Sequence, residues 1–374
     1  MEASRIQDPG GPPDAVGEAP ARVNLIGEHT DYAEGLVLPL PVPLWTRVEL
    51  RRRKDREVRA RTDLGGGDRG SYRLGEERPG RGWLDYLQGV TRSLARAGAA
   101  VRGAGLTVRS EIPAGSGLAS SAALTVAAVR AFDEAFALGL SSLEVARLAR
   151  AAETDFVGAP VGWMDPLAAS LGCPGEALFV DVRTLAAEPL ALPAALEVGV
   201  LHSGIAHRNA GGTYADRRRE ADAAARELGV PALRDISPGD EERIARLPPP
   251  LDRRARHVAT ENARVRAFVA ALRAGDIAAL GPLLAASHAS LRDDYQVSHP
   301  DVDTLVALAG QDPDVLGARM TGGGCGGAVL LLCPSGRALA AGDRIIEAYR
   351  ARTGRPGDVL LPRPPAALAA PRLG

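Results

Sequence analysis

Lysine is nearly absent from this chain. Lys54 is the only lysine among 45 basic residues, and all the others are arginine. A Walker A phosphate loop needs a lysine after its glycines, so the sequence excludes that loop. It also disfavours enzymes that use a lysine as a Schiff base or as a general base.

Cysteine and long apolar runs are scarce as well. Cys173, Cys325 and Cys333 are odd in number and lack metal-ligand spacing, so no disulfide framework is implied. A reducing compartment follows, and we expect a cytoplasmic protein. No apolar stretch is long enough to span a bilayer, and the N-terminus has no signal-peptide core. A formal net charge of −1 argues against nucleic-acid or anionic-membrane partners.

What is present is ample material for a core, with 45% hydrophobic residues in 374. This length predicts two domains, and we place them at 19–175 and 176–374 behind a flexible leader, 1–18. Apolar spacing and breaker residues predict the secondary structure. The predicted strands are 21–26, 106–112, 177–182, 196–201, 316–320 and 328–333. The predicted helices are 83–97, 120–138, 141–157, 165–172, 214–228, 255–273 and 277–291. The charged, Gly-rich stretch 51–82 reads as an edge hairpin or loop.

One segment with chemical potential is 113–123, which lies between a predicted strand and a predicted helix. Gly115 and Gly117 let the backbone approach a ligand closely. The helix that follows offers unpaired N–H groups and a positive dipole end, which suit phosphate. The hydroxyls of Ser120 and Ser121 are placed to contact phosphate or magnesium. The alternative is a plain glycine turn into an alanine-rich helix.

Two further segments carry polar groups or glycines. In 21–32, Glu28, His29 and Asp31 follow an apolar strand and are suited to bind several hydroxyls of one polyol. The alternative there is a solvated turn at a strand end. In 320–327, five glycines in six positions indicate close backbone approach to another group. The alternative is a tight turn between strands.

Taken together, these three segments closely resemble the galactokinase branch of the GHMP kinases. The resemblance runs from about residue 19 to beyond residue 330. It implies an α+β fold of two domains with the active site in the cleft between them. The N-terminal domain would be a mixed sheet with helices, like domain 2 of ribosomal protein S5. The C-terminal domain would be ferredoxin-like.

The resemblance also assigns catalytic roles. Asp165 would take the proton from the anomeric hydroxyl of the sugar, and Arg22 would lie beside it. An adjacent guanidinium favours the ionised carboxylate and offsets phosphate charge. From the residues alone, Asp165 followed by Pro166 also reads as a helix N-cap, which is the alternative role. The implied sugar contacts are Glu28, His29, Asp31, Gly162 and Tyr214.

The nucleotide side is implied in the same way. Magnesium would be held by Ser121 and Glu153, since this ion keeps several waters and needs few protein ligands. The alternative for Glu153 is an exposed position on a helix. The implied ATP contacts are Pro113, Gly115, Ser116, Gly117, Leu118, Ala119, Ser120, Ser121 and Gly323.

Some positions depart from the family pattern without removing a catalytic group. They are Ala21, Ala33, Pro166, His202 and Cys325. From the resemblance we expect transfer of the γ-phosphate of ATP to the C1 hydroxyl of galactose, giving galactose 1-phosphate and ADP, and we expect the chain to be a monomer. This is the first committed step of galactose catabolism. The alternatives are a related kinase of arabinose or N-acetylgalactosamine, and a non-catalytic galactose sensor.

Overall fold

The first strand begins earlier than the sequence predicts. The computed structural model describes residues 11–63, 67–113, 115–205 and 212–362. Within them β1 (Ala15–Asn24) starts inside the predicted leader, so that prediction is wrong for residues 15–18, and residues 1–10 lie outside the described part. The reason is close packing, because a Cβ on Gly17 would lie 1.9 Å from the carbonyl oxygen of Ala127. A small residue there lets a helix rest directly on the strand.

The N-terminal half is built on a five-stranded mixed sheet with the order β1-β3-β6-β4-β5. Its pairs are antiparallel except β4 with β6, which is parallel. The strands after β1 are β3 (Pro39–Arg52), β4 (Glu57–Thr62), β5 (Arg69–Arg73) and β6 (Ala104–Ser110). The β4–β5 hairpin occupies the sheet edge, which confirms the edge hairpin predicted from the charged stretch.

Strand β3 runs through three prolines, Pro39, Pro41 and Pro43. A proline cannot donate to a ladder, so it needs an unpaired strand edge. Strand β6 pairs with β3 only from Thr46 onward, while β1 covers the other edge from Pro39. The proline-bearing part of β3 therefore has one edge that β6 does not cover.

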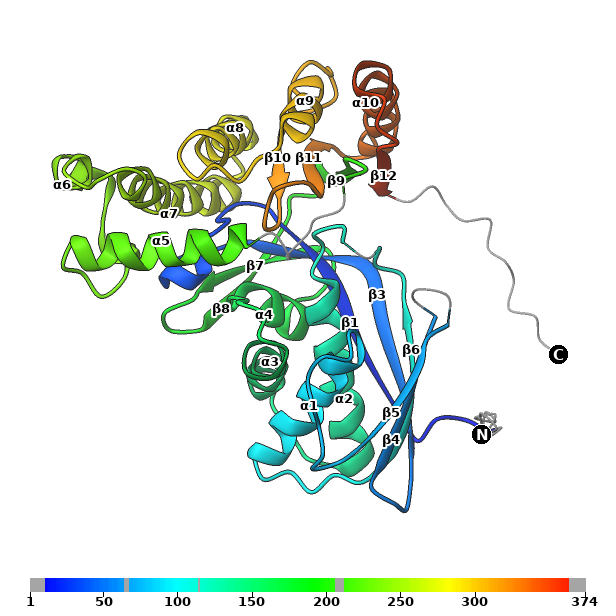
Figure 1. Cartoon of the computed structure of the whole chain (residues 1–374). Coiled ribbons are helices and arrows are strands. Elements are labelled where there is room, and N and C mark those ends of the chain that lie inside the picture. The colour runs from blue at the N-terminus through cyan, green and yellow to red at the C-terminus, as the bar shows by residue number, and fades with distance from the viewer. Residues whose placement is uncertain (1–10, 64–66, 114, 206–211, 363–374) are drawn as a thin grey trace.

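Helices cover one face of this sheet (Figure 1). They are α1 (Leu84–Arg96), α2 (Ser120–Phe136), α3 (Ser142–Ala151) and α4 (Met164–Leu171). Helix α2 packs against both β1 and β3. A capping box of Ser141 and Glu144 opens α3, and a π-helical turn, Ala152–Val157, extends it.

A small sheet links the two halves, with the order β2-β7-β8. Its strands are β2 (Leu36–Val37), β7 (Glu176–Asp181) and β8 (Ala186–Ala191). Strand β7 follows the predicted domain boundary, yet it pairs with β2 from the first half. The boundary between residues 175 and 176 stays a prediction.

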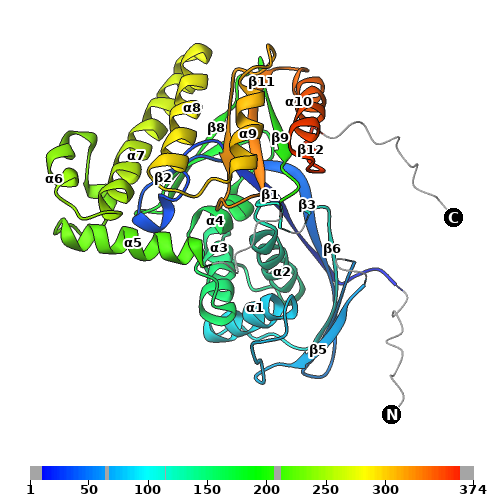
Figure 2. The same cartoon turned by 45° about the horizontal axis from the view of Figure 1, so that its top comes forward.

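The C-terminal half holds an antiparallel sheet with the order β10-β11-β9-β12. Its strands are β9 (Leu196–His202), β10 (Gly317–Thr321), β11 (Ala328–Pro334) and β12 (Asp358–Leu361). Helices α9 (Pro300–Ala309) and α10 (Ala338–Thr353) pack on it. In Figure 2 helices α5 to α8 extend to one side of this sheet. They are α5 (Thr213–Glu227), α6 (Glu241–Ala245), α7 (Leu251–Ala274) and α8 (Ile277–Asp293).

This arrangement agrees with a two-layer C-terminal half of antiparallel strands and helices. Of the helices in the described part of the chain, none is both long and apolar enough to cross a membrane.

Candidate active site

A bidentate ion pair joins the first strand to the start of α4. The Nε and Nη2 atoms of Arg22 donate to the two carboxylate oxygens of Asp165, each at 2.7 Å. The Nη1 atom of Arg22 donates to the carbonyl oxygen of Gly117, also at 2.7 Å. Arg22 is 4% exposed, whereas the Asp165 side chain is 25% exposed. One buried guanidinium thus joins the strand, the glycine loop and the aspartate.

Asp165 does not cap its helix. Trp163 precedes α4 at the cap position, without a side-chain capping bond, and Asp165 lies inside the first turn. The N-cap interpretation is therefore wrong, because the carboxylate is drawn to Arg22, whose planar fork matches it. A carboxylate has about four lone-pair sites, so Asp165 can still accept a further hydrogen bond from the solvent side.

The predicted phosphate loop bends sharply before α2. Gly115 has φ of 70° and Gly117 has φ of 79°, values that glycine adopts without strain. Ala119 precedes α2 in a left-handed conformation and provides no side-chain cap. The first N–H groups of α2 are therefore not capped by the preceding side chain, and a helix start of this kind suits phosphate. The Ser116 hydroxyl is buried and donates to the carbonyl oxygen of Pro113 at 2.7 Å, so it closes the loop.

The third glycine segment touches this loop. A Cβ on Gly322 would lie 2.8 Å from the carbonyl oxygen of Gly117. Gly322 also has φ of 87°, so the position suits glycine on two counts. Gly323 follows it and is partly exposed. The close approach expected from the glycines of 320–327 is thus an approach to the other glycine loop.

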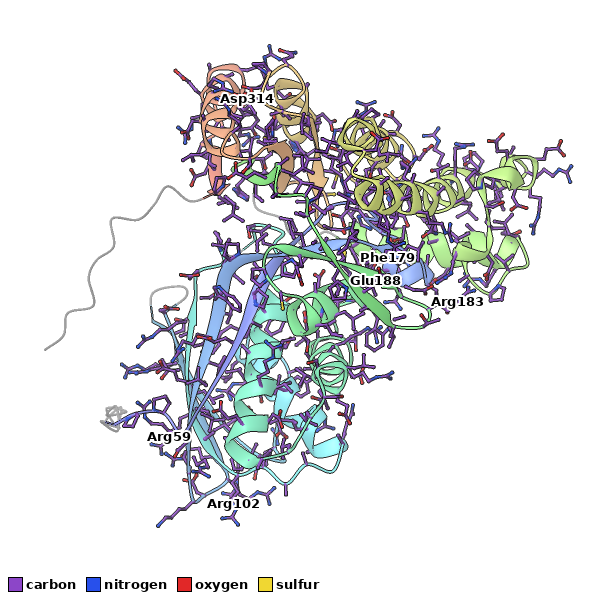
Figure 3. The ribbon with its side chains drawn as sticks, turned by 180° about the vertical axis from the view of Figure 1, so that it is seen from behind. Arg59, Arg102, Phe179, Arg183, Glu188 and Asp314 are labelled. Atoms are coloured by element: carbon purple, nitrogen blue, oxygen red, sulfur yellow. The ribbon has the colours of Figure 1, made fainter. Side chains whose placement is uncertain are left out.

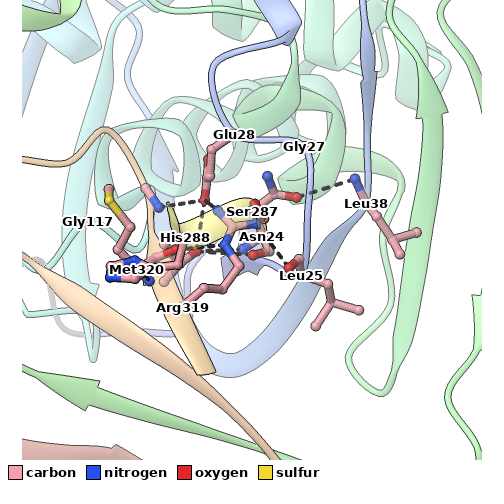
Figure 4. A network of polar contacts seen from close by, with 12 residues as sticks. Asn24, Leu25, Gly27, Glu28, Leu38, Gly117, Ser287, His288, Arg319 and Met320 are labelled. Carbon is pink, nitrogen blue, oxygen red and sulfur yellow. Dashed lines mark hydrogen bonds and ion pairs between the residues drawn. The ribbon is translucent and has the colours of Figure 1, made fainter. Parts of the chain in front are cut away.

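Glu28 holds the second and third segments together (Figure 4). Its Oε1 atom accepts from the Gly322 N–H at 2.7 Å and from the Thr321 hydroxyl at 3.1 Å. The Nη2 atom of Arg319 lies 3.1 Å from the same oxygen. Burial raises the pKa of Glu28, and Arg319 and Arg22 oppose that rise. Glu28 is 2% exposed, so it ties two backbone segments together from inside the protein.

Asp31 lies next to Gly162. A Cβ on Gly162 would be 1.6 Å from Asp31 Oδ2, so only glycine fits beside this carboxylate. The N–H groups of Met164 and Tyr32 donate to Asp31. Burial, and then the charge of Asp165, raise the pKa of Asp31 to about 6. Two carboxylates therefore share one part of the site.

Aromatic rings surround His29. The His29 Nδ1 atom lies 2.9 Å from the Tyr32 hydroxyl, which is 2.8 Å from the Tyr295 hydroxyl. The ring centroids of Tyr32, Tyr214 and Tyr295 lie 5.0–5.9 Å from that of His29. Burial, and then the charge of Asp31, raise the pKa of Tyr214 well above 10. His29, Asp31 and Tyr214, all predicted sugar contacts, thus lie together.

Glu153 is 1% exposed, so the exposed-helix alternative is wrong. It lies in the π-helical turn, where Ser121 donates to its carboxylate and the Thr125 hydroxyl lies 3.3 Å from Oε1. Burial raises the pKa of Glu153 to about 7, and the charge of Asp165 also raises it. A serine hydroxyl and a carboxylate in contact are oxygen donors of the kind that magnesium prefers. The pair fits the ion.

Comparison with known proteins places these segments in a family. The model of the galactokinase galactose-binding signature matches residues 6–52. The models of the GHMP kinases N terminal domain and of the GHMP kinases C terminal match residues 85–173 and 268–351. A galactokinase of Chloroflexus aurantiacus is 43% identical, and the match covers 92% of this chain and 90% of that protein. The chain belongs to the galactokinase family of GHMP kinases. A galactokinase of Mycobacterium tuberculosis is also 43% identical, over 88% of this chain and 92% of that protein.

Solved structures agree with the family assignment. The structure of Lactococcus lactis galactokinase complexed with galactose superposes with a TM-score of 0.86 at 30% identity, covering 92% of each chain. Methanococcus jannaschii mevalonate kinase, at 16% identity and a TM-score of 0.68, shares the fold. The two-domain α+β GHMP kinase fold predicted from the sequence is confirmed.

Sequence reasoning missed the residues that hold the family segments in place. On α7, Glu261 Oε1 accepts from the Gly27 N–H at 2.9 Å and from the Ser287 hydroxyl at 2.6 Å. Its neighbour Asn262 accepts from the Leu36 N–H at 2.8 Å. Both are buried, and so is Arg319, which stands between apolar neighbours in β10. The sequence signal that could have identified Arg319 was a charged residue inside an apolar strand, because such residues are rarely buried unless paired.

Proposed function

We propose that the chain is a sugar 1-kinase that transfers the γ-phosphoryl group of ATP to the C1 hydroxyl of galactose. The products are galactose 1-phosphate and ADP. Family membership supports the reaction class. The single observation that carries the proposal is Arg22, which binds Asp165 with two hydrogen bonds and Gly117 with a third. It places a partly exposed carboxylate beside a glycine loop suited to phosphate.

In the proposed mechanism Asp165 accepts the proton of the sugar hydroxyl as that oxygen attacks the γ-phosphorus, and the bond from that phosphorus to the β–γ bridging oxygen breaks so that ADP leaves. Arg22 orients both carboxylate oxygens, and its charge favours the anionic phosphoryl group in flight. The start of α2 supplies N–H groups to the other phosphate oxygens. Because the chain has no loop lysine, the arginine and these N–H groups carry the protein's share of charge stabilisation.

Ser121 and Glu153 would hold magnesium. When bound, that ion would neutralise part of the negative charge on the phosphates. For the described residues, no group of three or more His, Cys, Asp or Glu side chains is arranged around a metal. Two protein ligands suffice for an ion that already carries waters and nucleotide phosphates.

The sugar side of the proposal rests on Asp31, His29 and Tyr214, with Gly162 leaving room at Asp31. A buried site of this kind rejects a sugar that lacks a matching hydroxyl, because its own polar groups then stay unpaired. Glu28 supports the same turn, and we infer that it acts mainly on the position of the backbone. A cytoplasmic location and a monomeric state remain predictions from the sequence.

The experiment is an ADP-release assay over a panel of sugars. We expect galactose to give the highest kcat/KM, with arabinose and N-acetylgalactosamine far below it. Preference for either of these sugars would overturn the substrate. Galactose binding seen by calorimetry without any ADP release would instead favour a sensor and overturn the enzyme.

A further inference from the structure

A cavity of about 330 Å³ lies beside the proposed sugar site and shares the Asp31–Gly162 wall with it. The ion pair of Arg22 and Asp165 does not line it. Its walls come from the turn at 31–34, from α3 and α5, from residues 162–163 and from the segment 182–185. Three arginines line this cavity: Arg150, Arg183 and Arg218.

One of these arginines is neutralised. The Nε atom of Arg183 donates to Glu34 at 2.6 Å, and its Nη atoms donate to Asp235 at 2.7 and 2.9 Å. These carboxylates raise the pKa of Arg183. Figure 3 labels Arg183 at the rim of the molecule, near Glu188.

The other two differ from it. Arg150 lies over the Trp163 ring, with its guanidinium carbon 4.4 Å from the ring centroid. Its Nε atom is buried without a hydrogen-bond partner. Burial lowers the pKa of Arg150, and the charge of Arg218 lowers it further. Across the described ranges, no ion pair to a carboxylate is formed by Arg150 or Arg218.

This charge distribution is unfavourable as it stands. Two like charges lie close enough to disfavour each other, and one of them is partly desolvated. Glu34 on the wall is paired with Arg183, and the charges of Asp31 and Asp155 oppose the fall in the pKa of Arg150 without cancelling it. An anion between the two guanidinium groups would relieve this repulsion, since both arginines line the same cavity. Arginine suits such a role, because its fork matches the oxygens of phosphate and carboxylate.

We propose that this cavity is a second ligand site, which binds the phosphate or carboxylate group of a small molecule between Arg150 and Arg218. The oxyanion has two possible sources. It can belong to a free phosphate compound that binds beside the sugar, or to an acidic sugar that reaches across the wall at Asp31. The second source rests on the proposed function, whereas the first does not.

The first arm measures binding of inorganic phosphate by calorimetry at constant ionic strength. The protein is saturated with galactose, magnesium and a non-hydrolysable ATP analogue, so that the glycine loop is filled. We expect saturable binding to the wild type and affinity lower by about tenfold or more in Arg218→Gln, since a charge-assisted hydrogen bond is lost. Arg150→Gln should weaken binding as well, and Arg218→Lys should retain part of it.

Arg102→Gln is the matched control. It removes one exposed charge at the far end of the molecule from Arg183 (Figure 3), so phosphate affinity should stay within about twofold. Melting temperatures of all variants show whether a lost affinity reflects lost folding.

The second arm replaces galactose with galacturonate, which carries a carboxylate at C6, and omits phosphate. If galactose displaces galacturonate and Arg218→Gln weakens galacturonate binding, the oxyanion belongs to the sugar. Phosphate binding that persists with galactose bound would place it on a separate compound. If neither ligand binds, or if Arg218→Gln binds both as tightly as the wild type, the proposal is overturned. Galactose turnover, measured separately, distinguishes that result from a failure of the proposed function.

Discussion

Glu28 and Asp31 lie three residues apart on one buried turn, yet their surroundings differ. The Glu28 region, made of Glu28, Arg319, Thr321 and Gly322, gives its carboxylate a cation and two donors. The Asp31 region, made of Asp31, Gly162, Met164 and Asp165, places two carboxylates near each other with backbone donors for Asp31. The Glu28 carboxylate is paired with a cation, as buried structural charges usually are. The two neighbouring carboxylates of the Asp31 region repel each other and raise the pKa of Asp31, which is typical of functional sites.

The signature segment at 21–32 therefore contains two kinds of residue. Charge pairing offsets part of the cost of burying Glu28, while like-charge proximity and the partly exposed Asp165 carboxylate leave the Asp31 region open to a ligand. Removing a charged group should therefore lower stability in the Glu28 region and raise it at Asp31.

The largest effect should come from breaking the buried pair with Arg319→Met. This change leaves Glu28 buried without its cation and removes the donor to the Leu25 carbonyl oxygen. We expect the free energy of unfolding to fall by about 3–5 kcal/mol, measured by chemical denaturation. The matched control is Arg273→Met, which breaks an exposed pair with Glu188 and should cost under about 1 kcal/mol. Equal costs would remove the distinction between buried and exposed pairing here.

Gly162→Ala tests the close contact in the Asp31 region. The new methyl group would meet Asp31 Oδ2 and force the carboxylate aside, so we expect a stability loss of about 1–3 kcal/mol and weaker galactose binding. Gly310→Ala serves as a control, because its nearest neighbours are 3.7 Å away. A wild-type KM for galactose in Gly162→Ala would show that galactose binding does not depend on the position of the Asp31 carboxylate.

Asp31→Asn should stabilise the protein at neutral pH while weakening sugar binding. The amide oxygen can still accept the Met164 and Tyr32 N–H groups, and a buried charge near Asp165 is removed. We expect a gain of roughly 1–2 kcal/mol in the free energy of unfolding at pH 7, with a higher KM for galactose. A loss of stability on this change would show that the Asp31 charge is well paired.

A smaller effect concerns pH. The folded pKa of Asp31, about 6, lies above its ordinary value of 3.8, so folding takes up a proton between these values. The stability that the protonated group contributes is complete below about pH 4 and is lost as pH rises to about 6. The wild type should therefore lose about 1 kcal/mol or more relative to Asp31→Asn between pH 4.5 and 7. Parallel stability curves for the two proteins would contradict the raised pKa.

The elements with strong periodicity could be read from the sequence. The runs that became α1, α2 and β11 carry their apolar spacing in the residues themselves. Strand β8 could not be read this way, because Ala186–Ala191 contains Pro189 and little apolar side chain. Its place is fixed by pairing with β7. Helix α10 was missed although Ile345, Ile346 and Tyr349 repeat with helical spacing.

The candidate site also has parts that local sequence predicts and parts that it does not. The glycine loop and the turn at 27–32 were identified from local residue types. The pairing of Glu28 with Arg319 and of Gly27 with Glu261 joins residues far apart in the chain, and no local pattern specifies it. The cap assigned to Asp165 failed for that reason, since its partner Arg22 lies 143 residues away.

The central claim is that the Arg22-bound carboxylate of Asp165 acts on the reacting hydroxyl. Single-turnover ADP formation with galactose in Asp165→Asn tests it most directly, with the exposed Asp155→Asn as the matched control. We expect a rate about 10²–10⁴-fold lower for Asp165→Asn, an unchanged rate for Asp155→Asn, and similar melting temperatures for both. A rate for Asp165→Asn within a few-fold of the wild type would show that this carboxylate is not the catalytic base.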